Sequence, residues 1–365
     1  MRKNVFIDLH VLETVPPSCV NRDDTGSPKT AVYGGAVRAR VSSQCWKHAV
    51  RESFQRMLPQ EDVGLRTKHI HELLTQAILA RDPQANAEKL AEEALKAAGI
   101  SLKEDNKEEK KAKETEKSEK KTGALFFTSQ GQIDALAELA VSGEKLEKKA
   151  CQAALKAAPA VDIALFGRMV ADDPSLNFDA AAQVAHAIST HTVHNEYDYF
   201  TAVDDCAPED NAGAGHLGTV EYNSATLYRY ATIHMTELQR LLGDRTPEAV
   251  RAFIEAFIRS MPTGKINTFA NNVLPNAVYV TIRCDQPVNL VGAFEAPVQA
   301  GNGGYVKASV EALVKHAKSV TRDFLGEPER AFAIGEGMEP LAETMPLSGL
   351  LDAVESAVQE IGGQA

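Results

Sequence analysis

The chain has 365 residues, of which 44% are hydrophobic and 24% are charged. These proportions match ordinary globular proteins and exclude the disordered, collagen-like and mucin-like classes. The formal net charge of −11 argues, taken alone, against nucleic-acid binding, because nucleic-acid-binding proteins usually carry a basic surplus.

The charge is spread unevenly along the chain. Residues 1–60 contain nine basic and five acidic side chains, a net charge of +4, so the remaining residues carry −15. Such a chain can present one positive surface and stay soluble through its acidic remainder. A chance fluctuation explains the count equally well, so the count alone does not identify a binding surface.

Cysteine usage and the first residues indicate a cytoplasmic protein. The five cysteines are widely spaced and contain no CxxC pair, which predicts neither a disulfide framework nor a structural zinc site. Asp8, His10 and Glu13 interrupt the apolar run that a signal peptide needs, and no segment approaches the length of a transmembrane helix.

The first 60 residues predict a strand, a loop, a second strand and a helix. Apolar and polar residues alternate over Asn4–Leu12, and a polar loop follows over 16–29. A second alternating run begins after Gly34-Gly35 and places Val37, Ala39 and Val41 on one face and Arg38, Arg40 and Ser42 on the other. Ser42 or Ser43 is a good N-cap for a helix that continues to about Leu58.

The next hundred residues, 59–160, are rich in Ala, Leu and Glu and predict a helical region. Within it, Lys103–Lys121 contains eight lysines and seven acidic residues, which favours a disordered loop over a solvated helix. Helices are expected again over Leu125–Ala140 and Glu144–Ala158.

The remaining chain alternates strands and helices. Thr192–Asn223 is expected to leave the domain body as an aromatic, acidic and glycine-rich excursion. The later elements are expected as strands over Glu221–His234, Asn276–Cys284 and Arg330–Gly335, and helices over Thr246–Arg259, Val306–Phe324 and Pro346–Ile361. This order predicts a ferredoxin-like α+β core that carries a large helical insertion.

Two further motifs match known binding sites only in part. Gly213–Gly218 fits GxGxxG, but an acidic loop precedes it and a strand follows it, so we reject a dinucleotide site and expect a loop with Leu217 at its tip. His186, His191 and His194 lie near Glu196 and Asp198, yet their spacing matches no compact zinc site, which favours structural histidines.

Asp23 and Asp24 in the first loop leave a catalytic alternative open. Paired carboxylates of this kind could serve a metal-dependent or acid–base ribonuclease. The plainer interpretation, which we favour, is that they cap turns and pair with Arg22.

The basic block is the strongest physical signal in the sequence. Side chains on one face of a strand repeat about every 6.6 Å, so Arg38, Arg40 and Ser42 are expected to form a row of donors. The following helix begins beside this row, and helix N-termini attract anions. Lys47 and Arg51 share one face of that helix with His48 adjacent, which favours binding of a phosphate backbone over a merely solvated helix.

Several blocks of the sequence together resemble one known family. They keep their order over residues 4 to about 290, and they are Pro17–Asp24, Gly34–Gly35, Val41–Gln44, Val161–Met169, Val184–His191, Asp198–Asp205, Gly215–Thr219 and Tyr228–Tyr230. The chain resembles the CasC family, the backbone subunit of the type I-E CRISPR Cascade surveillance complex. Residues 60–150 and the last 70 residues match only loosely.

The resemblance implies an RRM-like (ferredoxin-like) α+β palm with a helical fingers insertion and a thumb loop. The implied boundaries are palm 1–58, fingers 59–181 with a flexible charged loop 103–121, palm 182–194, thumb loop 195–225 and palm 226–365. Several copies would stack along one CRISPR RNA and present it for pairing with target DNA. No cofactor or metal is implied, and the other partners would be further Cascade subunits, with no membrane.

The resemblance also assigns residues. RNA-backbone contacts in the family fall on positions that match Arg22, Lys29, Ser42, Gln44, Lys47 and Arg51. Met169 and Leu217 match positions that wedge apolar side chains beside a displaced base. Lysines near the family's DNA-contacting finger helix are Lys145, Lys148, Lys149 and Lys156.

We therefore expect a non-catalytic RNA-binding subunit that forms filaments. His48 stands where we expect arginine in relatives, so the phosphate contact there should be weaker or pH-dependent. The competing hypotheses are an aspartate-dependent ribonuclease, like the related backbone subunits of type III complexes, and a helix-rich enzyme whose site has no recognisable motif.

Overall fold

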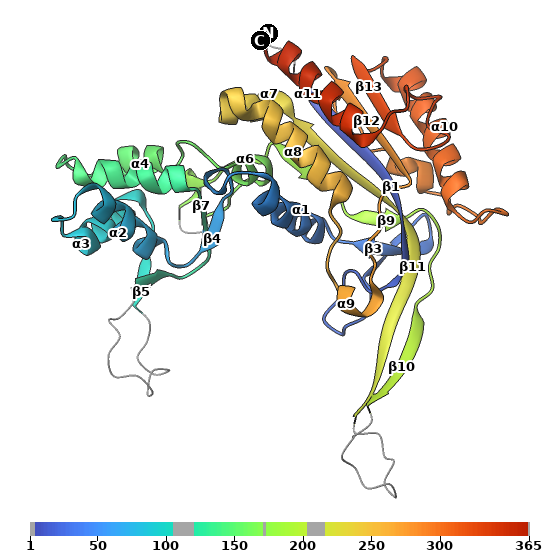
Figure 1. The fold of residues 1–365 in the computed structure, drawn as a ribbon, viewed down its shortest axis with the longest axis horizontal. Coiled ribbons are helices and arrows are strands. Elements are labelled where there is room, and N and C mark those ends of the chain that lie inside the picture. The colour runs from blue at the N-terminus through green and yellow to red at the C-terminus, as the bar shows by residue number, and fades with distance from the viewer. Residues whose placement is uncertain (1–3, 105–119, 171–172, 203–215, 364–365) are drawn as a thin grey trace, which may run out of the picture. The chain divides into compact units, whose positions relative to one another are not determined.

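We describe the protein from a computed structural model, which describes residues 4–104, 120–170, 173–202 and 216–363. The chain forms two compact units (Figure 1). Unit 1 comprises residues 1–54, 183–236 and 247–365, and unit 2 comprises residues 55–182 and 237–246. Unit 1 is therefore assembled from three separate segments of the chain.

Unit 1 is built on an antiparallel sheet with the strand order β13-β12-β1-β11-β9-β3-β2. The strands of this sheet and of its extensions are β1 (Phe6–Ser18), β2 (Thr30–Tyr33), β3 (Ala36–Val41), β8 (Ala182–Val184), β9 (Ala187–Ser189), β10 (Glu196–Ala202), β11 (His216–His234), β12 (Ala277–Arg283) and β13 (Arg330–Ile334). Together with the helices that flank it, this antiparallel sheet confirms the α+β class expected from the sequence.

Helices cover both faces of the sheet. Leu12 and Tyr228 lie on one face and pack against η5 and α10, whereas Arg229 points to the opposite face, where it meets α1 and α8. The helices that lie wholly or partly in this unit are α1 (Ser43–Met57), α7 (Met235–Leu242), α8 (Thr246–Arg259), α9 (Ile266–Phe269), η5 (Leu290–Phe294), α10 (Val306–Phe324) and α11 (Leu347–Gly363). The short helix η4 (Gly243–Arg245), between α7 and α8, belongs to unit 2. The long helices and strands expected from periodicity in residues 226–365 are confirmed to within a few residues.

Strand β1 runs further than the sequence predicted, from Phe6 to Ser18. Its pairing with β11 shifts register between Val15 and Ser18, where Pro16 and Pro17 lie. Proline has no N–H to donate, so it is tolerated in a strand at such an irregularity. The shift lets the strand continue to the loop that begins at Cys19.

The described residues of the excursion expected after Thr192 include a two-stranded ribbon. Strand β10 pairs with the first part of β11, from Glu196 opposite Tyr222 to Ala202 opposite His216. All seven residues of β10 are exposed. The ring of Phe200 covers Gly218 on the partner strand, where a Cβ would lie 2.3 Å from its Cζ. Residues 203–215, which include most of the glycine-rich motif, lie outside the described residues.

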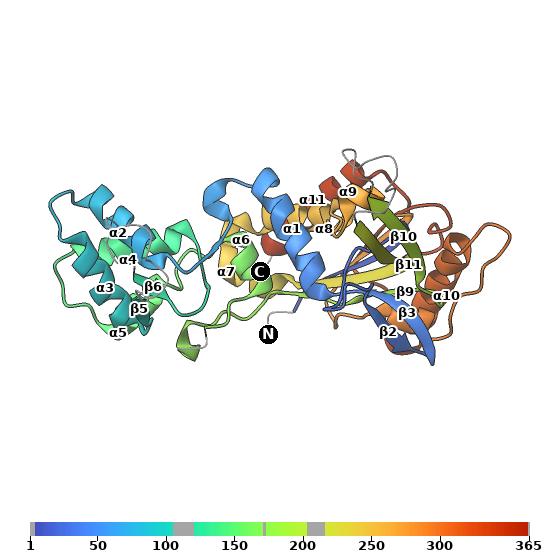
Figure 2. The same cartoon turned by 90° about the horizontal axis from the view of Figure 1, so that it is seen from below.

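Unit 2 contains a core of helices (Figure 2). It also has two short strand pairs, β4 with β7 and β5 with β6. Its elements are η1 (Gln60–Asp62), β4 (Leu65–Thr67), α2 (Ile70–Arg81), α3 (Ala87–Ala98), β5 (Leu102–Glu104), β6 (Lys120–Thr122), β7 (Phe126–Thr128), α4 (Gln130–Val141), α5 (Lys148–Ala154), α6 (Val161–Phe166) and η3 (Pro174–Leu176). In the part of the chain that the structure describes, no helix is both long and apolar enough to cross a bilayer.

Two expectations for unit 2 are corrected. Phe126–Thr128 is a strand that pairs with Leu65–Thr67, and α4 begins only at Gln130, where Ser129 and Gln132 form a capping box. The two ends of the charged run are strands as well, because Lys103 pairs with Lys121 and Glu104 with Lys120. The residues between them, 105–119, lie outside the described residues.

Candidate nucleic-acid interface

The first turn of α1 is built by Ser42 and Asn21. The Cys45 N–H donates to Ser42 Oγ at 3.3 Å, which makes Ser42 the N-cap, one of the two serines that the sequence predicted for this position. The Ser42 N–H in turn donates to Asn21 Oδ1 at 2.9 Å. The loop after β1 is therefore hydrogen-bonded to the start of the helix.

Helix α1 presents a polar stripe on one side and a buried face on the other. Gln44, Lys47 and Arg51 follow the i, i+3, i+7 spacing of one stripe; Gln44 is exposed and the two cations are half-buried. Trp46, Val50 and Phe54 form the buried face. Half-buried stems hold a cationic head near the helix surface, which suits contact with a phosphate backbone.

The buried face of α1 is held by a cluster of Glu13, Trp46 and Arg229, hereafter the Arg229 cluster. The Arg229 guanidinium carbon lies 3.7 Å from the centroid of the Trp46 ring, and Arg229 Nη1 lies 2.6 Å from Glu13 Oε2. Both charged side chains are about 1% exposed. Burial raises the pKa of Glu13 and the Arg229 charge opposes this rise. This contact fixes α1 to strands β1 and β11.

The expectation of an exposed donor row is wrong at Arg38. Its side chain is fully buried, and its guanidinium donates to Ser189 O at 3.0 Å, Phe294 O at 2.9 Å and Glu295 O at 3.2 Å. The face of β3 that carries Arg38 is covered by η5, whose last residue, Phe294, accepts one of these hydrogen bonds. Because these N–H groups donate to backbone carbonyls of the protein itself, Arg38 is a structural residue.

Arg40 and Lys29, in contrast, are only half-buried. Arg40 Nε donates to Thr30 O at 3.1 Å, and Arg40 Nη1 lies 3.4 Å from His186 Nδ1. The Lys29 N–H donates to Asn21 O at 2.8 Å, so the same asparagine positions both Lys29 and the start of α1. The structure thus places Lys29, Arg40 and the first turn of α1 in one region of unit 1.

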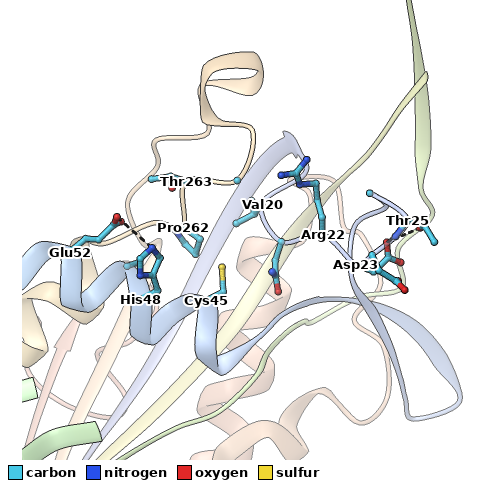
Figure 3. A pocket seen from close by; sticks show the side chains of 14 residues that line it. Val20, Arg22, Asp23, Thr25, Cys45, His48, Glu52, Pro262 and Thr263 are labelled. Carbon is cyan, nitrogen blue, oxygen red and sulfur yellow. Dashed lines mark hydrogen bonds and ion pairs between the residues drawn. The ribbon is translucent and has the colours of Figure 1, made fainter. Parts of the chain in front are cut away.

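A cleft of about 530 Å³ lies beside this region (Figure 3). One wall is the loop of residues 20–26, which includes the exposed Arg22, and another is residues 262–264. The third wall is the side of α1 that carries Cys45, His48 and Glu52, where His48 Nε2 lies 3.5 Å from Glu52 Oε1. His48 therefore faces the cleft and not the stripe of Lys47 and Arg51.

Asp23 closes a turn, which confirms one part of the plainer interpretation; the pairing with Arg22 stays a prediction. Its Oδ1 accepts from the Thr25 N–H at 2.9 Å, the Thr25 hydroxyl at 2.7 Å and the Ser27 N–H at 3.0 Å. The Thr25 hydroxyl bond, together with the backbone N–H bonds, lowers the pKa of Asp23. Bonds to the ionised form keep this carboxyl a carboxylate, which is unfavourable for a general acid.

The three histidines expected to be structural differ in burial. His191 is buried, stacks on Tyr305 with ring centroids 3.6 Å apart, and accepts from the Thr226 N–H at Nε2. Burial lowers the pKa of His191, and the structural interpretation is confirmed for it. His186 and His194 are exposed. Within the described ranges, no group of three or more His, Cys, Asp or Glu side chains is placed to hold a metal ion.

Met169 of unit 2 is presented by its buried neighbour Arg168. The Arg168 guanidinium lies between the rings of Phe126 and Phe178, 4.8 Å from each centroid, and donates to Phe127 O and Leu155 O. Burial lowers the pKa of Arg168 to about 10. Met169 itself is 87% exposed. An apolar side chain held outward in this way suits contact with another molecule.

The other candidate residues lie apart from α1 in the chain. Leu217 is in strand β11, opposite Thr201, and not at the tip of a loop as expected. Lys145, Lys148, Lys149 and Lys156 of unit 2 are all exposed, and Lys148 Nζ forms an ion pair with Asp173 Oδ2 at 2.9 Å. The expected roles of Leu217 and of these lysines stay predictions.

Sequence reasoning did not identify Asn21 or His186 as parts of this region. Their partners lie 21 and 143 residues away in the chain, so no local pattern signals either contact. It also did not single out Tyr197 and Tyr199, which are 66% and 65% exposed on strand β10. Their two-residue spacing, visible in the sequence, places them on one face of the ribbon.

Comparison with known proteins covers nearly the whole chain. The model of the CT1975-like protein family matches residues 7–356. One similar solved structure is a chain of a pre-nicking CRISPR RNA-guided surveillance complex, at 32% identity and a TM-score of 0.79, covering 97% of this chain and 100% of that chain. A second, also from a CRISPR RNA-guided surveillance complex, has 28% identity and a TM-score of 0.67, covering 96% and 99%. No curated protein sequence matches the chain.

Proposed function

Because the chain belongs to the CT1975-like protein family, we propose that it binds CRISPR RNA as the backbone subunit of a type I-E Cascade surveillance complex. The family match and the two surveillance-complex chains confirm the resemblance to Cas backbone subunits. The single observation that supports RNA binding is the cationic stripe of α1, whose opposite face is locked to the sheet by the Arg229 cluster.

In this proposal the antiparallel sheet of unit 1 is an RRM-like palm, and unit 2 provides the fingers. The phosphate backbone lies against Lys47 and Arg51, with Arg22, Lys29, Arg40, Ser42 and Gln44 near the start of α1. A rigid helix that carries spaced cations neutralises successive phosphates without reading bases. Sequence is then read by pairing between the guide and the target DNA strand.

Several copies stack along one RNA in the proposed assembly. The β10–β11 ribbon is the thumb, and its exposed Tyr197 and Tyr199 support contact with another molecule, because an isolated two-stranded ribbon is marginally stable in water. Met169 and Leu217 act as apolar wedges beside displaced bases. Lys145, Lys148, Lys149 and Lys156 contact target DNA. We expect this assembly in the cytoplasm.

We propose that the subunit itself is not catalytic. The carboxylate of Asp23 is engaged by Thr25 and Ser27, which supports a structural role for it. The assembled protein should therefore leave target RNA intact under all metal conditions. Robust cleavage that is lost in Asp23→Ala or Asp24→Ala would establish the ribonuclease alternative instead.

The test of RNA binding is the salt dependence of affinity. Lys47→Ala with Arg51→Ala should weaken binding of a single-stranded RNA and flatten the salt dependence by about two counterions. Lys315→Ala with Lys318→Ala on α10 removes the same charge from exposed positions of the same unit and should leave the slope unchanged. An equal slope in all three proteins would contradict the proposal, as would purification without RNA of discrete length.

A further inference from the structure

His186 occupies a position where two donors meet. Its Nδ1 lies 3.3 Å from the Ser43 N–H nitrogen and 3.4 Å from Arg40 Nη1. A backbone amide and a guanidinium can only donate, so Nδ1 is the acceptor and the proton of the neutral ring is on Nε2. Partial desolvation, together with the charges of Arg40 and Lys29, lowers the pKa of His186, which favours this neutral form.

Strand pairing brings His186 to this position. In the antiparallel pair of β3 and β9, Arg40 lies opposite Ile188 and Val41 opposite Ala187. The next step of this register takes the chain from Ala187 to His186, beside the point where β3 ends and α1 begins. The Ala185 N–H donates to Tyr230 O at 2.9 Å, so the backbone is fixed on both sides of the histidine.

Arg40 is held at two points as a result. Nε donates to Thr30 O on β2, and Nη1 is directed to the imidazole from the β8–β9 connection. A guanidinium is planar, so two fixed donors on it determine the directions of the remaining N–H groups. The half-buried Arg40 is thereby oriented without being neutralised, because neither partner carries a negative charge.

We infer that His186 is a positioning residue: it orients the Arg40 guanidinium so that Arg40 binds the phosphate backbone of single-stranded RNA beside the start of α1. This inference rests on the proposed function and adds to it a residue that acts through Arg40. His186 need not touch the RNA.

A double-mutant cycle tests this role. We expect His186→Ala to weaken the binding of a single-stranded RNA oligonucleotide roughly fivefold, the size of one typical hydrogen bond. In the Arg40→Ala background the same change should have no further effect, because Arg40 is the group through which His186 acts. His186→Asn should restore most of the affinity, since its Oδ1 can accept where Nδ1 did.

His194→Ala is the matched control, because His194 is an exposed histidine of the same segment. Its effect should be the same with and without Arg40. The inference is overturned if His186→Ala leaves affinity unchanged, or costs as much in the Arg40→Ala background as in the wild type. If Lys47→Ala with Arg51→Ala still flattens the salt dependence, such a failure removes only the role of His186 and leaves the proposed function standing.

Discussion

The guanidinium carbon of Arg229 lies 3.7 Å from the centroid of the Trp46 ring, and Arg229 Nη1 pairs with Glu13 Oε2 at 2.6 Å. Trp46 comes from α1, Glu13 from β1 and Arg229 from β11, so the contact joins the candidate RNA-binding helix to two central strands. A cation over an indole is favourable when both are removed from water. The positions of Lys47 and Arg51 relative to the sheet therefore depend on this buried contact.

Removing one partner of this buried pair should destabilise the protein strongly. Arg229→Met leaves the Glu13 carboxylate uncompensated and is expected to lower the free energy of unfolding by about 3–5 kcal/mol. Glu13→Gln with Arg229→Met removes both charges and should recover part of the loss. Chemical denaturation followed by circular dichroism measures both. A decrease of less than about 1 kcal/mol in the free energy of unfolding of Arg229→Met would contradict a stabilising role for this pair.

Arg38 should behave as a stability residue and not as an RNA contact. Arg38→Met leaves two buried carbonyl groups and one part-buried carbonyl group without this donor, so the free energy of unfolding should fall by about 2–4 kcal/mol. The salt dependence of RNA binding should stay at its wild-type value. In Arg22→Met, whose side chain is exposed, the expected pattern is the reverse. Salt titrations and urea unfolding of the two variants distinguish these outcomes.

The turn between β2 and β3 offers a matched pair of glycines. Both have positive φ, +58° at Gly34 and +74° at Gly35, so alanine is strained at either by about 1–2 kcal/mol. Only at Gly34 would a Cβ collide, 1.7 Å from Glu295 O, which also accepts from Arg38. Gly34→Ala should therefore be clearly more destabilising than Gly35→Ala in thermal unfolding. Equal melting temperatures would refute the close contact with Glu295.

Stability should fall at acid pH because His10 is buried in its neutral form. Burial, with a contribution from Arg283, lowers the pKa of His10 to about 3, and its Nδ1 lies 2.8 Å from the Tyr228 hydroxyl. The unfolded chain takes up this proton near pH 6.5, so the stabilisation is complete above about pH 6.5 and is lost as the pH falls toward about 3.

His10→Gln tests this dependence. Below about pH 5.5, the wild type should lose about 1.4 kcal/mol per pH unit more than the variant in urea unfolding. His194→Ala, which removes an exposed histidine, should keep the wild-type slope. Parallel pH profiles for the wild type and His10→Gln would contradict a neutral His10 in the folded protein.

Elements whose signals are local could be predicted from the amino-acid sequence alone. Helices α1, α8 and α10 begin and end close to the predicted residues, because N-caps, a first-turn proline and 3.6-residue periodicity all act within a few residues of one another. The cationic stripe of Lys47 and Arg51 was visible for the same reason. Short strands such as β2 and β7 were missed, since three or four residues carry no clear period.

Which cations can meet a ligand depends on contacts between residues far apart in the chain. Alternation correctly separated the faces of β3, but burial of Arg38 depends on η5, more than 250 residues later, and on the carbonyl groups it supplies. The same holds for Arg40, which is oriented by His186 through the pairing of β3 with β9. A basic surplus in residues 1–60 is a property of composition, whereas the availability of each donor depends on the partners that strand order brings beside it.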